Sequence, residues 1–234
     1  MTDTPNVLLI GAGALGCAAA RALAATRTVA LTLVDDDVVE LSNLQRQVLY
    51  DGGDIGEPKV EAAAARLRTE FGTAVTARNE RAGASNAAAL LAGADIVIDA
   101  CDDPDTKFLL NRECVQARLP LIYGGVARTG GQWMLIEPGR SCCLACVFPP
   151  QGSESAQGCS AMGILAPVAG LVGTMQALMA LSWLARPSRS RSGRLFLYEL
   201  TRARLRYVDF PRSPGCDCRA AASDPCARSD RGLS

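Results

Sequence analysis

Histidine is absent from this chain, since none occurs among its 234 residues. Because histidine supplies the base of Ser-His-Asp and Cys-His catalysis and the ligands of HExxH metal sites, its absence excludes those classes of enzyme. Net charge is missing too, because 24 Lys and Arg balance 24 Asp and Glu. No overall field attracts nucleic acid, so we expect no nucleic-acid partner. The chemistry must rest on carboxylates, Lys, Arg, Cys and metal ions.

The first residues lack the basic segment, apolar stretch and small-residue cleavage site of a secretory signal, so we expect a cytoplasmic protein. Ten cysteines in such a chain favour metal binding or reactive thiols over disulfides. The uncharged stretch 162–185 is long enough to cross a bilayer. Because it contains Pro167 and several polar residues, we interpret it as a buried core or dimer-interface helix and expect no membrane span.

Short apolar runs alternate with helical patterns over the first 125 residues. Strands are expected at 6–10, 29–34, 75–77, 96–98 and 121–123, and helices at 15–25, 59–71, 86–92 and 105–118. This alternation is typical of an α/β protein with a Rossmann-like, doubly wound and mostly parallel sheet. Strands expected at 132–136, 195–200 and 205–208 would extend the sheet antiparallel. We therefore divide the chain into residues 1–125, residues 126–218 and a tail, 219–234, that we expect to be disordered.

A glycine-rich turn follows the first expected strand and opens the first expected helix. Gly11 permits the tight turn, Gly13 lets a phosphate approach the backbone, and Gly16 lets helix and strand pack closely. Asp35 follows Gly16 by 19 residues, at the end of the second strand, where a carboxylate can accept hydrogen bonds from a ribose. These features fit NAD and ATP equally well.

A longer motif distinguishes the two nucleotides. The run DDDVVELSNLQRQ at 35–47, followed by GEPKV at 56–60, closely resembles the adenylating enzymes of the ThiF/MoeB/HesA family, relatives of the ubiquitin-activating enzymes. The resemblance implies that Asn43, Arg46 and Lys59 contact the triphosphate of ATP. Physical reasoning agrees, because joining a carboxylate to ATP gathers several negative charges that need cations around them. A dehydrogenase needs no such cluster.

The run DACDD at 99–103 ends the fourth expected parallel strand, so its carboxylates should open onto the same sheet edge as the glycine turn. Magnesium bound to phosphate oxygens takes one or two protein carboxylates. Asp102 matches the magnesium aspartate of the family, and Lys107 stands where the family has an arginine, so the resemblance implies that Lys107 stabilises the leaving pyrophosphate. The alternative is that Asp102 and Asp103 only cap the helix that begins near Asp105.

Paired cysteines occur at CLAC, 143–146, and at CDC, 216–218. They resemble the two C-x-x-C pairs that hold structural zinc in the family, which assigns zinc to Cys143, Cys146, Cys216 and Cys218. Cys142 or Cys226 could replace one member, and buried or reactive thiols are the alternative.

Cys159, in QGCSAMG, matches the crossover-loop cysteine of the family. That cysteine forms a thioester or acyl-persulfide with the carrier protein in some members and is dispensable in others. No base or cation is close in the sequence, so nothing local activates the thiol. A covalent role and an inert loop cysteine both stay open.

The resemblance implies ATP-dependent adenylation of the C-terminal glycine carboxylate of a small ubiquitin-like sulfur-carrier protein ending in Gly-Gly. Residues 1–125 would bind ATP and Mg²⁺, and residues 126–218 would bind Zn²⁺ and dock the carrier. We expect a homodimer that receives sulfur from a separate donor protein. One alternative is an NAD-dependent oxidoreductase, suggested by the glycine turn and Asp35. Another is a non-catalytic relative that binds a carrier or nucleotide, since no arginine-bearing helix typical of the family precedes Asn6.

Overall fold

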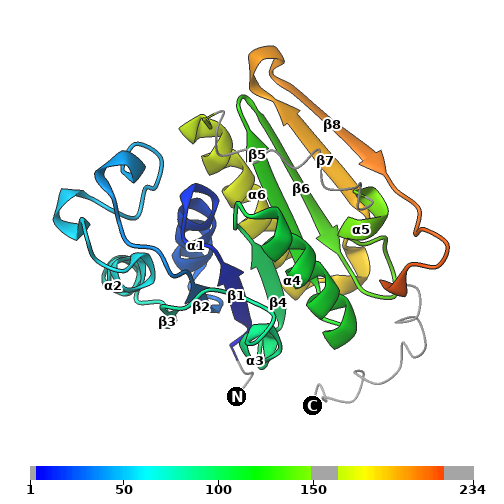
Figure 1. Ribbon diagram of the computed structural model, residues 1–234, viewed down its shortest axis with the longest axis horizontal. Helices are drawn as coiled ribbons and strands as arrows, with labels where there is room; N and C mark the ends of the chain where they lie inside the picture. Colours follow the sequence, from blue (N-terminus) through cyan, green and yellow to red (C-terminus); the bar gives the residue numbers. More distant parts are fainter. Residues whose placement is uncertain (1–3, 149–162, 219–234) are drawn as a thin grey trace.

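The computed structural model describes residues 4–148 and 163–218. Within these residues, eight strands form one sheet of order β3-β2-β1-β4-β5-β6-β7-β8 (Figure 1). The strands are β1 (Asn6–Ile10), β2 (Ala30–Val34), β3 (Val75–Arg78), β4 (Ile96–Asp99), β5 (Leu121–Ala127), β6 (Gly130–Ile136), β7 (Arg194–Glu199) and β8 (Arg204–Asp209). Strands β1 to β5 pair in parallel, and β6, β7 and β8 continue the sheet antiparallel. The expected α/β class and sheet type are confirmed.

Helices cover both faces of the sheet (Figure 1). They are α1 (Ala14–Thr26), α2 (Lys59–Phe71), α3 (Ala87–Leu91), α4 (Pro104–Ala117), α5 (Leu144–Val147) and α6 (Ala166–Ala185), with short 3₁₀ turns η1 (Leu41–Asn43), η2 (Gly52–Asp54), η4 (Pro187–Arg189) and η5 (Leu200–Arg202). One hydrophobic cluster joins α1, α2 and α6 to the sheet, and the other joins α3, α4 and α5 to the opposite face. The result is a three-layer arrangement.

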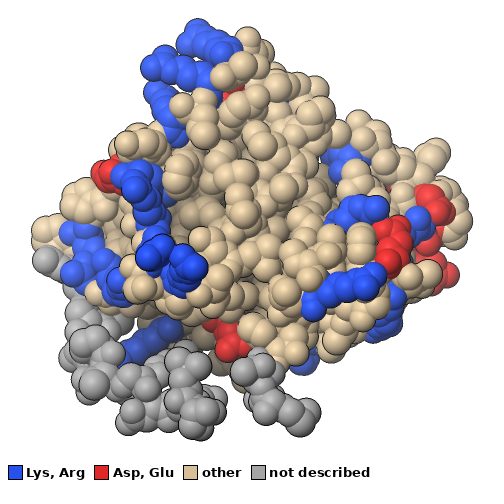
Figure 2. Space-filling view, turned by 180° about the vertical axis from the view of Figure 1, so that it is seen from behind, with Lys and Arg blue, Asp and Glu red and all other residues tan. Residues whose placement is uncertain are grey.

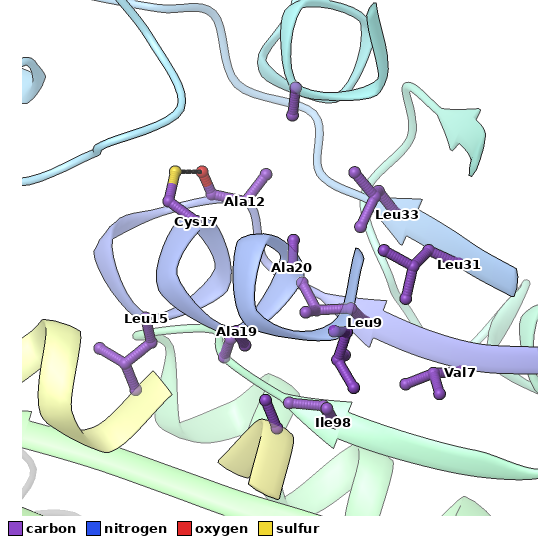
Figure 3. Packing of buried hydrophobic residues seen from close by; sticks show 14 of the residues in the cluster. Val7, Leu9, Ala12, Leu15, Cys17, Ala19, Ala20, Leu31, Leu33 and Ile98 are labelled. Carbon is purple, nitrogen blue, oxygen red and sulfur yellow. Dashed lines mark hydrogen bonds between the residues drawn. The ribbon is translucent and has the colours of Figure 1, made fainter. Parts of the chain in front are cut away.

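Small residues let α1 and α6 pack side by side. A Cβ added at Gly173 of α6 would lie 2.2 Å from the carbonyl oxygen of Leu15 in α1, so the two backbones meet where a side chain does not fit. Figure 3 shows the packing of α1 on the sheet, where Ala19 and Ala20 of α1 lie in one hydrophobic cluster with strand residues such as Leu9 and Ile98. The alanine-rich sequence of α1 therefore decides how closely the helix approaches the sheet.

Helix α6 confirms the expectation of a long apolar helix, although it begins at Ala166. The helix has 20 residues, and its most apolar 18-residue stretch has a mean hydropathy of 1.5, values that would suit a membrane span. Within that stretch, 39% of the residues are buried in the protein. It packs along α1, β5 and β6, which is the position of a core helix. Its fully buried Gln176 donates hydrogen bonds to the carbonyl oxygens of Asp99 and Ile122, so this helix face meets polar backbone at the sheet edge.

The expected elements appear close to their expected bounds. The strand expected at 195–200 ends at Glu199 because η5 begins at Leu200, and β5 and β6 are longer than the sequence indicated. The proposed division after residue 125 falls inside β5, in a sheet that continues without interruption, and it stays a prediction. The tail 219–234 lies outside the described residues.

Candidate functional site

A cavity of about 1280 Å³ lies at the carboxyl ends of the parallel strands and continues along the antiparallel strands to β8. This is the edge at which doubly wound sheets bind ligands. Every residue that the sequence assigned to nucleotide or magnesium, except Gly16, lines it: Gly11, Gly13, Asp35, Asn43, Arg46, Lys59, Asp102 and Lys107. The fold thus gathers residues from four separate segments around one space.

The glycine turn has the geometry that the sequence predicted. Gly11 has a φ of +97°, and a Cβ there would lie 2.7 Å from the carbonyl oxygen of Ala100. A Cβ at Gly16 would lie 1.9 Å from the carbonyl oxygen of Gly11, so helix and turn touch directly. At Gly13 the nearest atom would be 3.9 Å away, on Gln47, which leaves the backbone open to the cavity. A phosphate can therefore approach the start of α1 closely.

Buried side chains support the turn from below. The Tyr50 hydroxyl donates to the carbonyl oxygen of Ala12 at 2.8 Å, and the Cys17 thiol donates to the same oxygen at 3.3 Å (Figure 3). Burial raises the pKa of Cys17 to about 12, so this thiol stays neutral and acts as structural support.

Asp35 ties the second strand to the turn. One of its carboxylate oxygens accepts the Ala12 N–H at 2.6 Å, and the other accepts the Asp37 N–H at 2.9 Å. Burial raises the pKa of Asp35 above its usual value, against these two hydrogen bonds. Because each carboxylate oxygen can accept more than one hydrogen bond, Asp35 retains the capacity to bind a ribose hydroxyl.

The expected phosphate ligands lie on the segment after β2 and at the start of α2. Lys59 is buried, and its Nζ lies 2.7 Å from Asp37 Oδ2. Arg46 is half-buried and donates through Nη1 to the carbonyl oxygen of Ser42 at 2.9 Å, while Asn43 is 7% exposed. A phosphate that reached Lys59 would compete with the Asp37 carboxylate for the same ammonium group.

Gln47 also lines this site, although its residue type in the sequence did not indicate a role. It is 4% exposed, lines the cavity beside Gly13, and its Oε1 has no hydrogen-bond partner within the described part of the chain. A buried polar atom without a partner costs free energy unless a ligand or water satisfies it. Its position at the end of the NLQRQ run was the signal that could have identified it.

Asp103, and not Asp102, caps the helix after β4. The Asp103 carboxylate accepts the backbone N–H of Thr106 at 2.9 Å and its hydroxyl at 2.6 Å, and the hydroxyl hydrogen bond lowers the pKa of Asp103. The helix begins at Pro104, one residue earlier than expected. Asp102 is exposed and lines the cavity, as a carboxylate that binds a hydrated cation must be.

Lys107 is held by protein groups. Its Nζ donates to both oxygens of the fully buried Asp99 at 3.1 Å and to the carbonyl oxygen of Gly124 at 2.7 Å. Burial lowers the pKa of Lys107, but the charge of Asp99 raises it above its usual value, so the ammonium stays charged. The lysine thereby joins the end of β4 to the middle of β5, and its contact with pyrophosphate stays a prediction.

Four cysteines gather at the opposite edge of the sheet. The sulfur atoms of Cys143, Cys146, Cys216 and Cys218 all lie within 4.8 Å of one another, with closest separations of 3.5, 3.6 and 3.9 Å. Tetrahedral zinc with Zn–S bonds of about 2.3 Å puts its sulfur ligands roughly 3.8 Å apart, so these residues fit zinc.

Hydrogen bonds favour the thiolate form of one of the four cysteines, Cys146, whereas burial raises the pKa of Cys143 and of Cys218. Burial works to raise the pKa of Cys146, but backbone hydrogen bonds from Ser213 and Cys143 outweigh it and lower this pKa to about 6. Cys142 donates instead to the carbonyl oxygen of Gly193, and Cys226 lies outside the described residues. Cys159 also lies outside the described residues.

A glycine turn at the carboxyl edge of a doubly wound sheet defines the class of this chain as a nucleotide-binding α/β protein. The model of the ThiF family matches residues 3–220, and the chain belongs to that family.

Known relatives agree with this membership. The chain is 37% identical over 217 residues to the molybdopterin-synthase adenylyltransferase of Escherichia coli K12, a match that covers 91% of this chain and 86% of that protein. It is 36% identical to the SAMP-activating enzyme E1 of Haloferax volcanii, over 90% of this chain and 78% of that one. The crystal structure of E. coli MccB with ATP has the same fold, with a TM-score of 0.80 at 23% identity over 92% of this chain and 67% of MccB.

Proposed function

We propose that this chain is an adenylyltransferase that uses ATP to activate the C-terminal glycine carboxylate of a ubiquitin-like sulfur carrier ending in Gly-Gly. The observation that carries the proposal is the convergence of Asn43, Arg46, Lys59 and Asp102 on one cavity beside the glycine turn. The family and the adenylyltransferase names of relatives at 36–37% identity support the use of ATP. An NAD-dependent oxidoreductase would leave this cluster of cations without a purpose.

The reaction joins two anions. A carboxylate oxygen of the carrier attacks the α-phosphorus of ATP, a carboxylate–phosphorus bond forms, and the bond to the β-phosphate oxygen breaks, releasing pyrophosphate. No general base is needed, because the carboxylate is already ionised at neutral pH. Arg46 and Lys59 stabilise the negative charge that moves onto pyrophosphate, and Lys59 exchanges Asp37 for phosphate as ATP binds.

The remaining nucleotide contacts follow from the same cavity. Asp35 holds the ribose, the open backbone at Gly13 meets phosphate, and Asn43 and Gln47 supply polar groups beside it. Asp102 offers an exposed carboxylate to Mg²⁺, which neutralises phosphate charge when bound. Lys107 acts on pyrophosphate from its position between the end of β4 and the middle of β5.

Zinc has a structural role in this proposal, because the cysteine cluster lies at the sheet edge away from the cavity. Reduced thiols persist in the cytoplasm, which supports a cytoplasmic location. Sulfur would come from a separate donor protein.

A homodimer is supported by exposed apolar side chains beside α6. Leu178 of α6 is 55% exposed, and Leu205 and Tyr207 of β8, on the same sheet face, are 56% and 55% exposed. Figure 2 shows a broad surface with few charges on the side opposite to the view of Figure 1. Exposed apolar side chains on a sparsely charged surface are typical of protein contacts. Sedimentation of a monomer at micromolar concentration would contradict the dimer.

Exchange of labelled pyrophosphate into ATP tests the reaction. We expect exchange that depends on the carrier, tried first with the carrier subunit of E. coli molybdopterin synthase and then with other small proteins ending in Gly-Gly. Asp102→Ala should lower the exchange rate by about a hundred- to a thousand-fold, the usual effect of losing one preorganised electrostatic contact. Asp105→Ala, which removes an exposed carboxylate from the first turn of the helix that follows, is the control. Normal exchange by the Asp102 variant would contradict its assignment to magnesium.

In this scheme, the Cys159 thiol reacts with the carrier only after the carrier has been adenylated. A thiol can attack the carrier's carbonyl carbon only once AMP is attached as a leaving group, so Cys159→Ala should retain exchange. A folded Cys159 variant that is inactive in exchange would contradict this order of steps. Calorimetry with tight NAD binding and no ATP binding would overturn the proposed function as a whole, and ATP binding without exchange would favour a non-catalytic relative.

A further inference from the structure

Three arginines line the end of the cavity that lies farthest from the glycine turn. Arg202 is in η5, and Arg204 and Arg206 are in β8, on the same sheet face because alternate residues of a strand point the same way. All three are exposed, and none forms a salt bridge within the described part of the chain. Figure 2 shows basic side chains gathered over the β7–β8 turn.

The neighbouring strands do not neutralise this arginine row, by which we mean Arg202, Arg204 and Arg206. Arg206 lies opposite Leu197, and Arg204 lies opposite Glu199. Glu199 is the only acidic residue that β6, β7, η5 or β8 contributes to the cavity lining. Three cations against one carboxylate leave a net positive surface, which favours a negatively charged partner.

The distance across the sheet separates the arginine row from the nucleotide. From β4, beside the glycine turn, to β8 there are four strand spacings, or roughly 19 Å at about 4.8 Å each. The phosphates of a nucleotide bound at the glycine turn do not reach that far. An extended polypeptide covers the same span in about five or six residues.

One cavity connects the glycine turn with the arginine row. Gly125 and Gly130 line it between the two ends and carry no side chains of their own, and the Tyr123 hydroxyl lies over Gly125, 2.8 Å from where a Cβ would be. A carrier whose terminal carboxylate reaches the α-phosphate would therefore hold its folded body over β7 and β8.

We infer that the arginine row binds carboxylates on the folded body of the carrier, so that this chain selects a carrier with an acidic surface next to its Gly-Gly tail. The inference rests on the proposed function and specifies its partner. The row lines the same cavity as the adenylation residues, and the chain has no net charge to attract nucleic acid, so a protein surface is the occupant that fits.

The test reverses the charges. Arg204→Glu together with Arg206→Glu should raise the KM for the carrier by roughly tenfold or more, because like charges then face each other, while kcat at saturating carrier and the Kd for ATP stay unchanged. The matched control is Arg189→Glu with Arg191→Glu, which changes the net charge equally at exposed positions outside this cavity. The probe is the E. coli molybdopterin synthase carrier subunit, or whichever Gly-Gly protein supports exchange with the unchanged enzyme.

Each outcome has a distinct meaning. A carrier in which acidic residues beside the tail are changed to Lys should recover a low KM with the Glu variant and lose it with the unchanged enzyme. Equal KM values for the variant and its control overturn the inference and leave the proposed function intact. Weaker binding of a fluorescent single-stranded oligonucleotide, with an unchanged carrier KM, assigns the row to nucleic acid and also overturns it. No exchange with any Gly-Gly protein contradicts the proposed function itself.

Discussion

The parallel half of the sheet, strands β1 to β5, differs from the antiparallel half, strands β6 to β8, in how its cationic side chains are buried and paired. In the parallel half, Lys59 pairs with Asp37 and the nearly buried Lys107 pairs with the fully buried Asp99. In the antiparallel half, Arg194 pairs with an Asp209 side chain that is 62% exposed, and the arginine row has no salt bridge within residues 4–148 and 163–218. Buried, paired cations suit a small ligand that needs preorganised groups. Hydrated surface cations suit a protein partner that binds and leaves.

The cysteine cluster should have the largest effect, because it fastens the ends of β6 and β8 to α5. We expect about one zinc per chain and its loss in the double variant Cys143→Ser, Cys146→Ser. Structural zinc sites bind with apparent free energies of about 10–16 kcal/mol, so a large loss of stability should follow. Metal analysis after reductive purification, with thermal unfolding, measures both. Cys142→Ser is the control, and unchanged zinc in the double variant would refute the assignment.

Replacing one cation in each half of the sheet tests whether the buried ion pair contributes more to stability than the exposed one. Lys107→Met leaves the Asp99 carboxylate buried without a cation beside it and should lower the free energy of unfolding by about 3–5 kcal/mol. Arg194→Met removes a pair whose Asp209 carboxylate is 62% exposed, and it should cost much less. Urea unfolding compares the two variants. Adding Asp99→Asn to Lys107→Met should restore part of the loss, and equal costs for the two single variants would contradict the contrast.

Helix α6 packs against strands of both the parallel and the antiparallel half of the sheet, and its glycines Gly170 and Gly173 have different surroundings. Gly173→Ala should destabilise the protein by about 1–3 kcal/mol, because the new methyl group meets the Leu15 carbonyl oxygen at 2.2 Å. A Cβ at Gly170 has no other atom within 4 Å, so Gly170→Ala should stabilise the protein by up to about 1 kcal/mol. Thermal melts with effects of the same sign would show that the α1–α6 contact is looser than described.

The cap of α4 should have the smallest effect, and it should depend on pH. Asp103→Ala should cost about 1 kcal/mol at pH 7. Since the Thr106 hydroxyl lowers the pKa of Asp103 in the folded state, this stabilisation is complete above the unfolded pKa of about 3.9 and is lost as pH falls through the lower folded value. Denaturation at pH 7 and in acid should show the difference disappear, and a difference that does not depend on pH would exclude the charged cap.

Much of the nucleotide end could be predicted because its signals are local. The glycines of the turn occupy neighbouring positions, and their spacing reports backbone conformation and close packing, which do not depend on distant parts of the chain. The NLQRQ run and the cysteine pairs are also short motifs, and their resemblance to the family supplied their interpretation. Sequence reasoning was less successful where a side chain's partner comes from another element, as for Gln47, whose buried and unpaired oxygen only the folded cavity reveals.

The sequence by itself determined the class of sheet and the position of the glycine turn, because periodicity and spacing carry that information along the chain, and the resemblance of its paired motifs to the family indicated the cysteines that meet. The tertiary structure alone decided that Asp37 holds Lys59, that Asp99 holds Lys107, and that the arginine row faces the same cavity as the glycine turn. These relations depend on which strands lie side by side and on how deeply each charge is buried. Both follow from packing the layers together, since burial and neighbouring charges govern the strength of an ion pair and neither can be read from spacing along the chain.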